Sequence, residues 1–153
     1  MRSAEQLASV VLDKADSTLP VNILAIIKGM GIRIYFCPFS DFVNGFYTII
    51  DGTPTIAINS RHGAKRQRFT AAHELYHHIA EGMDLQLAAS ITSMAREKKA
   101  DRFAAAVLMP SSSFKDLFNR GMSFMGLASA FKVSQQAAEI RAIELGLTAR
   151  MIA

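Results

Sequence analysis

A short histidine-rich segment constrains this chain more than any other feature. The chain has four histidines, and three of them lie in residues 73–78, which read HELYHH. On an α-helix, His77 lies about 40° around the axis from His73, and Glu74 lies about 100° from it. Two imidazoles can therefore face one metal ion with a carboxylate beside them, a spacing typical of zinc peptidases. The competing interpretation is a helix whose histidines are partly exposed and bind nothing.

The apolar residues of the same segment predict how this helix packs. These apolar residues share the arc of the helix beside the two histidines, so this arc is the side expected to face the core. They are Phe69, Ala72, Leu75, Tyr76 and Ile79. We expect a helix with one buried face and one metal-binding face.

A third ligand is expected on a second helix. A catalytic zinc ion usually takes three protein ligands and leaves one position for water, so two histidines are too few. In segment 91–109, Glu97 and Asp101 share one helical stripe with small apolar residues, opposite lysines and arginines. A carboxylate pair on an inward stripe is costly unless something compensates it. We expect Glu97 to bind the metal and Asp101 to accept the free N–H of a ligand histidine, with His73 as the expected partner.

Two further residues have metal-binding chemistry. His78 lies about 100° from His77, so a solvent-facing or supporting role is favoured over ligation. Cys37 is the single cysteine and cannot form an internal disulfide. One hypothesis makes Cys37 an inhibitory fourth ligand, because a thiolate binds zinc strongly. The favoured interpretation is a small hydrophobic residue in or after a strand.

The order of the predicted elements indicates an α+β fold. The elements are helices at 3–16 and 20–30, a strand at 32–39, a hairpin of strands at 45–51 and 55–60, and helices from residue 64 onward. Gly52-Thr53-Pro54 between the two hairpin strands is a typical turn signal. The chain of 153 residues is long enough to bury one core. We therefore expect residues 1–153 to form a single domain with N-terminal helices, a small antiparallel sheet and a C-terminal helical region.

Composition and charge limit the partners and the location. No apolar run approaches the roughly 18–20 residues that span a bilayer. Residues 1–17 read as an amphipathic helix and not as a secretory signal, so we expect a cytoplasmic protein without a membrane partner. The net charge of +4 favours acidic partners. Lysines and arginines gather at 61–68 and 96–102, where solvated helix faces are favoured over a nucleic-acid surface because no aromatic residues interleave.

Two segments resemble the ImmA/IrrE family of metallopeptidases. They read RQRFTAAHELYHHIAEG at residues 66–82 and EKKADRFAAAVLMP at residues 97–110. The resemblance extends upstream to the hairpin and downstream to residues 124–147, which are similar to the family's helix-turn-helix-like tail. Tyr76 stands where family members commonly have a small residue. Its expected position on the core side leaves metal ligation intact.

The resemblance implies a gluzincin-like site and a class of substrate. The zinc ligands would be His73, His77 and Glu97, with Glu74 as general base and Asp101 as outer-shell partner. The implied substrate is a helix-turn-helix transcriptional repressor, cleaved in a stress, phage or mobile-element response.

The expected mechanism is metal-assisted hydrolysis of a peptide bond. Zinc would polarise the carbonyl, and Glu74 would move a proton from water to the leaving nitrogen. The strand at 55–60, if it is a sheet edge, would pair with an extended substrate. Four residues have chemistry suited to stabilising the oxyanion: Tyr47, His62, Arg66 and Tyr76.

A regulator without catalysis is the competing class of function. Residues 124–147 read as two helices joined by a short turn, as in many DNA-binding proteins. The second helix is nearly neutral, whereas a helix that reads the major groove lies among phosphate-contacting lysines and arginines. A packing or substrate-docking role is therefore favoured for this tail over direct nucleic-acid binding. A peptidase-like fold kept only for interaction would have no need of Glu74.

Overall fold

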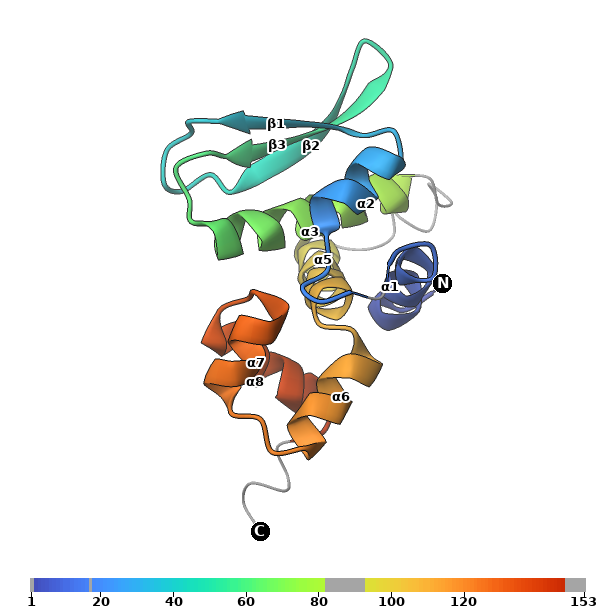
Figure 1. The fold of residues 1–153 in the computed structure, drawn as a ribbon. Coiled ribbons are helices and arrows are strands. Elements are labelled where there is room, and N and C mark those ends of the chain that lie inside the picture. The colour runs from blue at the N-terminus through green and yellow to red at the C-terminus, as the bar shows by residue number, and fades with distance from the viewer. Residues whose placement is uncertain (1, 17, 82–92, 148–153) are drawn as a thin grey trace.

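The computed structural model describes residues 2–16, 18–81 and 93–147, and within them the chain is an α+β protein (Figure 1). The elements in chain order are α1 (Ala4–Leu12), α2 (Ile23–Gly29), β1 (Arg33–Cys37), β2 (Gly45–Ile50), β3 (Thr53–Asn59), α3 (Ala64–Glu81), α5 (Ser93–Leu108), α6 (Ser111–Asn119), α7 (Phe124–Phe131) and α8 (Gln135–Glu144). The predicted fold class is confirmed. The sequence also predicts a helix break near Gly82, and this position lies outside the described residues.

Side-chain caps explain where several helices begin. The hydroxyl of Ser3 accepts from the backbone N–H of Gln6 at 3.1 Å, and the Gln6 side chain accepts from the Ser3 N–H at 2.8 Å. This capping box satisfies two N–H groups that helix α1 leaves without partners. Asn22, Ser123 and Ser134 cap α2, α7 and α8 with a single side-chain acceptor each.

The three-stranded sheet is mixed, with β3 between β1 and β2. β2 and β3 form the predicted antiparallel hairpin, although its turn is Asp51-Gly52 and not Gly52-Thr53-Pro54. The φ angles of Asp51 and Gly52 are 49° and 77°, as expected for the turn that favours this dipeptide. β1 pairs with β3 in parallel, so the prediction of an antiparallel sheet is wrong for this strand.

The loop at 38–44 is the reason for this order. It carries the chain from β1 to the far edge of the sheet, and β3 then fills the position between β1 and β2. β3 is therefore central, so residues 55–60 do not meet the condition under which they would pair with a substrate, namely that they form a sheet edge. The sheet edges within the described residues are β1 and β2.

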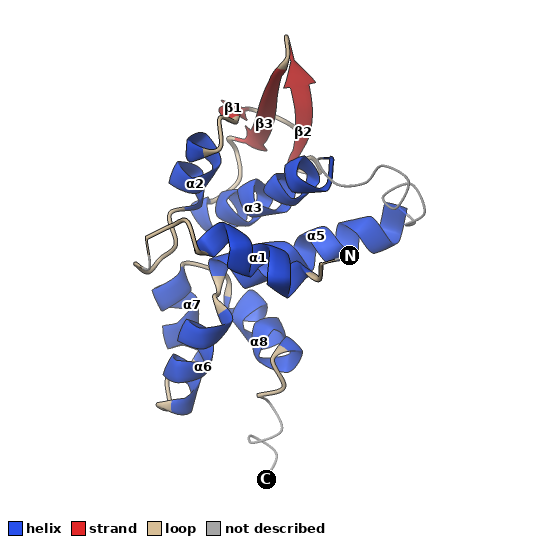
Figure 2. Ribbon diagram, turned by 90° about the vertical axis from the view of Figure 1, so that its right-hand side faces the viewer, coloured by secondary structure: helices blue, strands red, loops and turns tan. Residues whose placement is uncertain are grey.

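Helix α3 lies across one face of the sheet, and α5 packs on the other side of α3 (Figures 1 and 2). Ile56 and Ile58 of β3 belong to the same buried cluster as Leu75 of α3 and Phe103 of α5. This cluster continues into α1 and α6–α8, so one core connects the sheet to the C-terminal helices. No helix among the described residues has the length and apolar character needed to cross a membrane.

Arg141 ties the last helix to the first. Its side chain is fully buried, and its Nε donates to the backbone oxygen of Met109 at 3.0 Å. Its two terminal nitrogens donate to the carboxylate of Glu5 in α1, one of them at 3.1 Å. Arg141 is one of the charged residues that make this helix nearly neutral in sequence, and its burial was not predicted. Ala138 and Ala142 are also fully buried, so this side of α8 faces the core.

The pairing of Glu5 with a buried guanidinium predicts a large effect on stability. Glu5→Ala leaves the charge of Arg141 without its carboxylate, so we expect the free energy of unfolding to fall by about 2–3 kcal/mol. Urea unfolding followed by circular dichroism measures this fall. The control is Asp13→Ala at the exposed end of α1, where we expect a change within about 0.5 kcal/mol. Equal losses in the two variants would contradict the role given to this ion pair.

Candidate metal centre

Helix α3 presents two histidines on one side and core residues on the other. Leu75 is fully buried, and Tyr76 is 2% exposed, with its ring centroid 5.8 Å from that of Phe103. The side chains of His73 and His77 are 16% and 19% exposed, and their ring centroids lie 5.2 Å apart. The predicted helix with one core face and one histidine face is confirmed.

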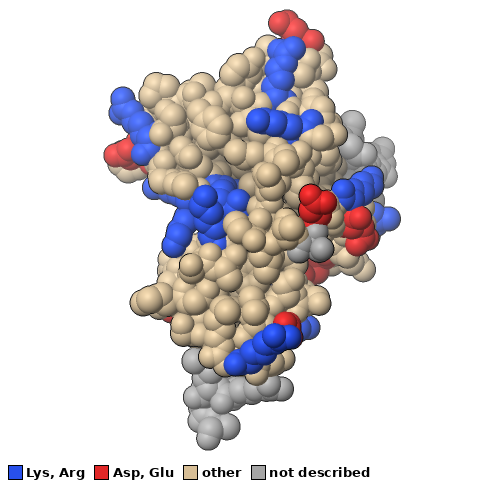
Figure 3. Space-filling model, in the orientation of Figure 1, with Lys and Arg blue, Asp and Glu red and all other residues tan. Residues whose placement is uncertain are grey.

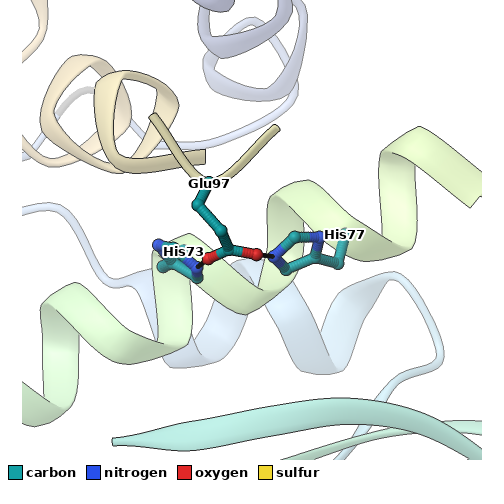
Figure 4. Close-up of side chains that lie close together, drawn as sticks. All are labelled: His73, His77 and Glu97. Atoms are coloured by element: carbon teal, nitrogen blue, oxygen red, sulfur yellow. Dashed lines mark hydrogen bonds and ion pairs between the residues drawn. The ribbon is translucent and has the colours of Figure 1, made fainter. Parts of the chain in front are cut away.

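Helix α5 places a carboxylate against both imidazoles (Figure 4). Oε2 of Glu97 lies 2.7 Å from Nε2 of His73, and Oε1 lies 3.1 Å from Nε2 of His77. One ligand atom from each of these three residues lies within 4.8 Å of the other two. One turn further along α5, Oδ1 of Asp101 lies 2.7 Å from Nδ1 of His73. The structure therefore brings together the four residues that the two sequence segments pointed to.

The hydrogen bonds of His73 indicate that this cluster suits a cation. A neutral imidazole carries one N–H, yet both ring nitrogens of His73 lie 2.7 Å from carboxylate oxygens. If Nδ1–H donates to Asp101, Nε2 turns its lone pair toward Glu97, and a proton or a metal ion must lie between them. Burial lowers the pKa of His73, but the hydrogen bond to Asp101 and the charges of Glu74, Asp101 and Glu97 outweigh burial and raise it overall.

The donor set and its spacing fit zinc. Two imidazole nitrogens and one carboxylate oxygen are a usual set for a catalytic zinc ion. Donor atoms around a tetrahedral zinc ion lie roughly 3.3 Å apart. The two nitrogen–oxygen separations, 2.7 and 3.1 Å, are close to this value, and all three donor atoms lie within 4.8 Å of one another. Burial also lowers the pKa of His77, which favours the neutral imidazole that binds metals.

The two carboxylates of α5 are more exposed than the sequence predicted. The side chains of Glu97 and Asp101 are 54% and 60% exposed, whereas Ala104 and Leu108 on the same stripe are fully buried. The stripe faces α3 as predicted, but the part of α5 that enters the core begins at Ala100. The cost of burying a carboxylate therefore does not support a role for these two residues. What supports a role for Glu97 and Asp101 in metal binding is their contact with the histidines.

The contact between Asp101 and His73 predicts a moderate effect on metal affinity. Asp101→Ala removes the acceptor that holds the His73 ring, so we expect zinc affinity to weaken roughly 10–100-fold without being abolished. Competition against a chelating dye measures the change, with Asp116→Ala on the exposed side of α6 as control. Unchanged affinity in Asp101→Ala would contradict this role. So would a zinc-bound structure with an Asp101 oxygen roughly 2 Å from the metal.

Glu74 lies beside the cluster at the wall of a cavity of about 490 Å³, which His73 and Glu97 also line. Its side chain is largely buried, with 8% of the residue exposed. Burial raises the pKa of Glu74 to about 7; the charge of His73 and a hydrogen bond from the Tyr47 backbone oppose this rise, and the charge of Glu97 adds to it. A nearby metal cation would lower this pKa. A carboxyl group in this position is suited to accepting a proton and releasing it again.

Sequence and structure comparisons give the chain a family and a fold. The family model described as the IrrE N-terminal-like domain, a peptidase family, matches residues 27–142. The chain belongs to this family. Among solved structures, a Mycobacterium tuberculosis transcriptional regulator has the same fold, with a TM-score of 0.71 and 14% sequence identity. The alignment covers 90% of this chain and 54% of that one, so the chain spans about half the length of that protein. No curated protein sequence matches the chain.

In this IrrE-like chain, the loop at 38–44 forms a further part of the cavity wall that the sequence did not reveal. Fully buried Asn59, the last residue of β3, holds the loop. Its Nδ2 donates to the backbone oxygens of Ser40 and Val43 at 2.9 and 2.8 Å. An asparagine that ends a strand gives no sequence signal for such a role.

Asn44 lines the same cavity and has a fixed orientation. Its Oδ1 accepts from Nε and from a terminal nitrogen of Arg66 at 3.0 and 2.8 Å. Because the oxygen faces Arg66, the Nδ2 donors face elsewhere. The next residue, Gly45, lies so close to its neighbours that a Cβ there would come within 2.3 Å of the Ala57 oxygen. A glycine is therefore required for β2 to begin beside the cavity.

The other sequence candidates lie outside the group of metal-binding atoms. Nδ1 of His78 lies 2.9 Å from the hydroxyl of Tyr47, and His78 is not part of that group, as favoured. Cys37 pairs with Asn59 on the β1 side of β3 and is also outside the group. The hypothesis that Cys37 is a fourth ligand is therefore wrong for the described part of the chain. None of the four oxyanion candidates lines the cavity: Tyr47, His62, Arg66 and Tyr76.

Proposed function

We propose that this chain is a zinc-dependent metalloendopeptidase of the cytoplasm, with residues 1–153 acting as one domain. His73, His77 and Glu97 hold the zinc ion, Asp101 orients His73, and Glu74 is the general base. The observation that carries the proposal is the convergence of two imidazoles and a carboxylate from two helices beside a buried glutamate. Membership of a peptidase family supports the same reaction class.

Bound zinc would supply Lewis acidity, which polarises a peptide carbonyl and makes water more acidic. Glu74 takes a proton from the attacking water at its carboxylate and passes it to the leaving nitrogen. Its burial and the N–H of Tyr47 fix the position of that carboxylate. Asp101 holds the Nδ1 proton of His73, so that Nε2 stays available to the metal.

The substrate segment is extended and lies along β2. This strand is a sheet edge and begins at Gly45 in the cavity wall, so its outer backbone groups can pair with a peptide. Asn44, whose amide oxygen is occupied by Arg66, offers its Nδ2 donors to the peptide backbone. The backbone of β2 and the side chain of Asn44 therefore replace the strand at 55–60 as the proposed substrate-binding groups, because that strand is central in the sheet.

The physiological substrate is a helix-turn-helix transcriptional repressor. Resemblance to the ImmA/IrrE family supports this assignment, and the solved regulator of the same fold is consistent with a regulatory setting. The alternative is a regulator that binds DNA or protein without catalysis. The burial of Arg141 disfavours direct DNA reading by α8, because this side chain cannot reach a phosphate.

Removal and return of the metal test the proposal. Purified protein is incubated with the helix-turn-helix protein encoded nearest to it, before and after treatment with phenanthroline and after adding zinc. We expect cleavage to stop on chelation and to return with zinc, because the proposed mechanism assigns polarisation of the peptide carbonyl to a metal held by the three ligands. Cleavage that persists in chelator would show that the zinc assignment is wrong. A partner that stays intact under all conditions would favour the regulator.

A further inference from the structure

A second hollow lies next to the metal centre. This cleft, of about 940 Å³, is bounded by the start of α3, the middle of α5 and the turn between α7 and α8. Its lining is largely apolar and includes Phe69, Ala105, Val133, Ala137 and Ile140. Ile140 is 46% exposed, so part of this apolar surface is open to a partner. The proposed hydrolysis has no role for such a surface.

The rim of the cleft is basic. Five cationic side chains line it, namely Lys65, Arg66, Lys98, Arg102 and Lys132. The two acidic side chains that also line it are already engaged, Asp101 with His73 and Glu144 with Arg102 at 3.6 Å. The three lysines are exposed and form no ion pair with any described residue. Figure 3 shows lysine and arginine side chains gathered over the start of α3, above the part of the molecule formed by α7 and α8.

The cleft adjoins the metal centre. Phe69 and Asp101 line both the cleft and the cavity that contains Glu74. A chain segment bound in the cleft would therefore lie within a few residues of a segment bound along β2. An apolar floor with a cationic rim is complementary to an amphipathic helix whose polar face is acidic.

We propose that this cleft is a docking site for an acidic amphipathic helix of the protein substrate. The proposal rests on the proposed peptidase function, since it gives the cleft the task of holding the protein whose neighbouring segment is cut. Nucleic acid fits the surface less well. Its phosphates would use the lysines, but the bases would meet a floor that contains one aromatic ring and otherwise small aliphatic side chains.

The binding test uses the Glu74→Gln chain, so that docking is measured without cleavage. The probe is a fluorescein-labelled peptide of about 18 residues, long enough for a helix, with leucines on one face and glutamates on the other. Fluorescence anisotropy gives its Kd. We expect Lys65→Glu combined with Lys132→Glu to raise the Kd about 10-fold or more, and Ile140→Asp to do the same. We also expect binding to weaken with added salt.

The matched control combines Lys28→Glu with Lys115→Glu, an equal change of charge at exposed positions of α2 and α6 that do not line the cleft. The Kd of this variant should equal that of the parent. Thermal unfolding checks that all variants remain folded, and the lysines and Ile140 that are substituted in the Glu74→Gln chain are all exposed. Equal weakening in the control, or no saturable binding, would overturn the proposal. So would tighter binding of duplex DNA that depends on the lysines and not on Ile140.

Failure of docking and failure of the peptidase assignment give different results. If the peptide does not bind but the repressor is still cleaved, the docking proposal is wrong and the peptidase proposal stands. If the peptide binds at the cleft but the zinc-loaded wild type does not cleave the repressor, the peptidase proposal is wrong and the docking proposal stands. If both hold, the cleft variants should lower kcat/KM for the whole repressor and leave that for a short unstructured peptide unchanged.

Discussion

Replacing Glu74 with glutamine is expected to lower the cleavage rate about 10²–10⁴-fold while zinc content stays at the wild-type level. Glutamine keeps the size of the side chain and its contact with the Tyr47 N–H, but it cannot take a proton from water. The three proposed ligands are unchanged, so the metal should remain bound. Single-turnover cleavage of the repressor measures the rate, and plasma emission spectroscopy measures the zinc.

The control for this variant is Glu139→Gln in α8, which makes the same chemical change away from the metal centre. We expect its rate to match that of the wild type. A Glu74→Gln rate within threefold of wild type would mean that another group acts as the base. Loss of zinc from the variant would instead mean that Glu74 supports the ligands.

Replacing His77 with alanine is expected to remove zinc almost completely. The site then retains one imidazole and one carboxylate, which is too few ligands for a stable catalytic zinc ion. The neighbouring substitution His78→Ala is the matched control, because His78 contacts Tyr47 and lies outside the metal-binding group. It should keep about one zinc per chain. Equal loss from both variants, measured after dialysis against the same buffer, would show that the ligands are wrongly assigned.

The helices of the metal centre were the most predictable part of the structure. A helical repeat of 100° per residue fixes which side chains of a short segment share a face, and nothing distant in the sequence is needed. The core face of α3 and the shared stripe of Glu97 and Asp101 followed from this local geometry. The position of these carboxylates opposite the histidines was instead inferred from the need for a third ligand and from the family resemblance. The exposure of the two carboxylates could not be predicted from helical geometry, because it depends on where α5 leaves the core.

Features that depend on distant pairing were harder to predict. The hairpin has a local turn signal, but the parallel pairing of β1 with β3 requires the loop at 38–44 to pass to the other edge of the sheet. Asn59, which holds that loop, looks in sequence like any polar residue at the end of a strand. Arg141 finds its partner Glu5 at the other end of the chain, so the sequence of α8 alone gives no signal that this charge is buried.

The masses of the cleavage products test the central claim most directly. Zinc-loaded wild-type protein and the Glu74→Gln variant are each incubated with the repressor, and intact masses are recorded by mass spectrometry. The proposed function predicts two fragments with the wild type, whose masses sum to that of the repressor plus one water molecule, and intact repressor with the variant. An intact repressor with zinc-loaded wild type, or the same fragments from both proteins, would contradict hydrolysis at this metal centre.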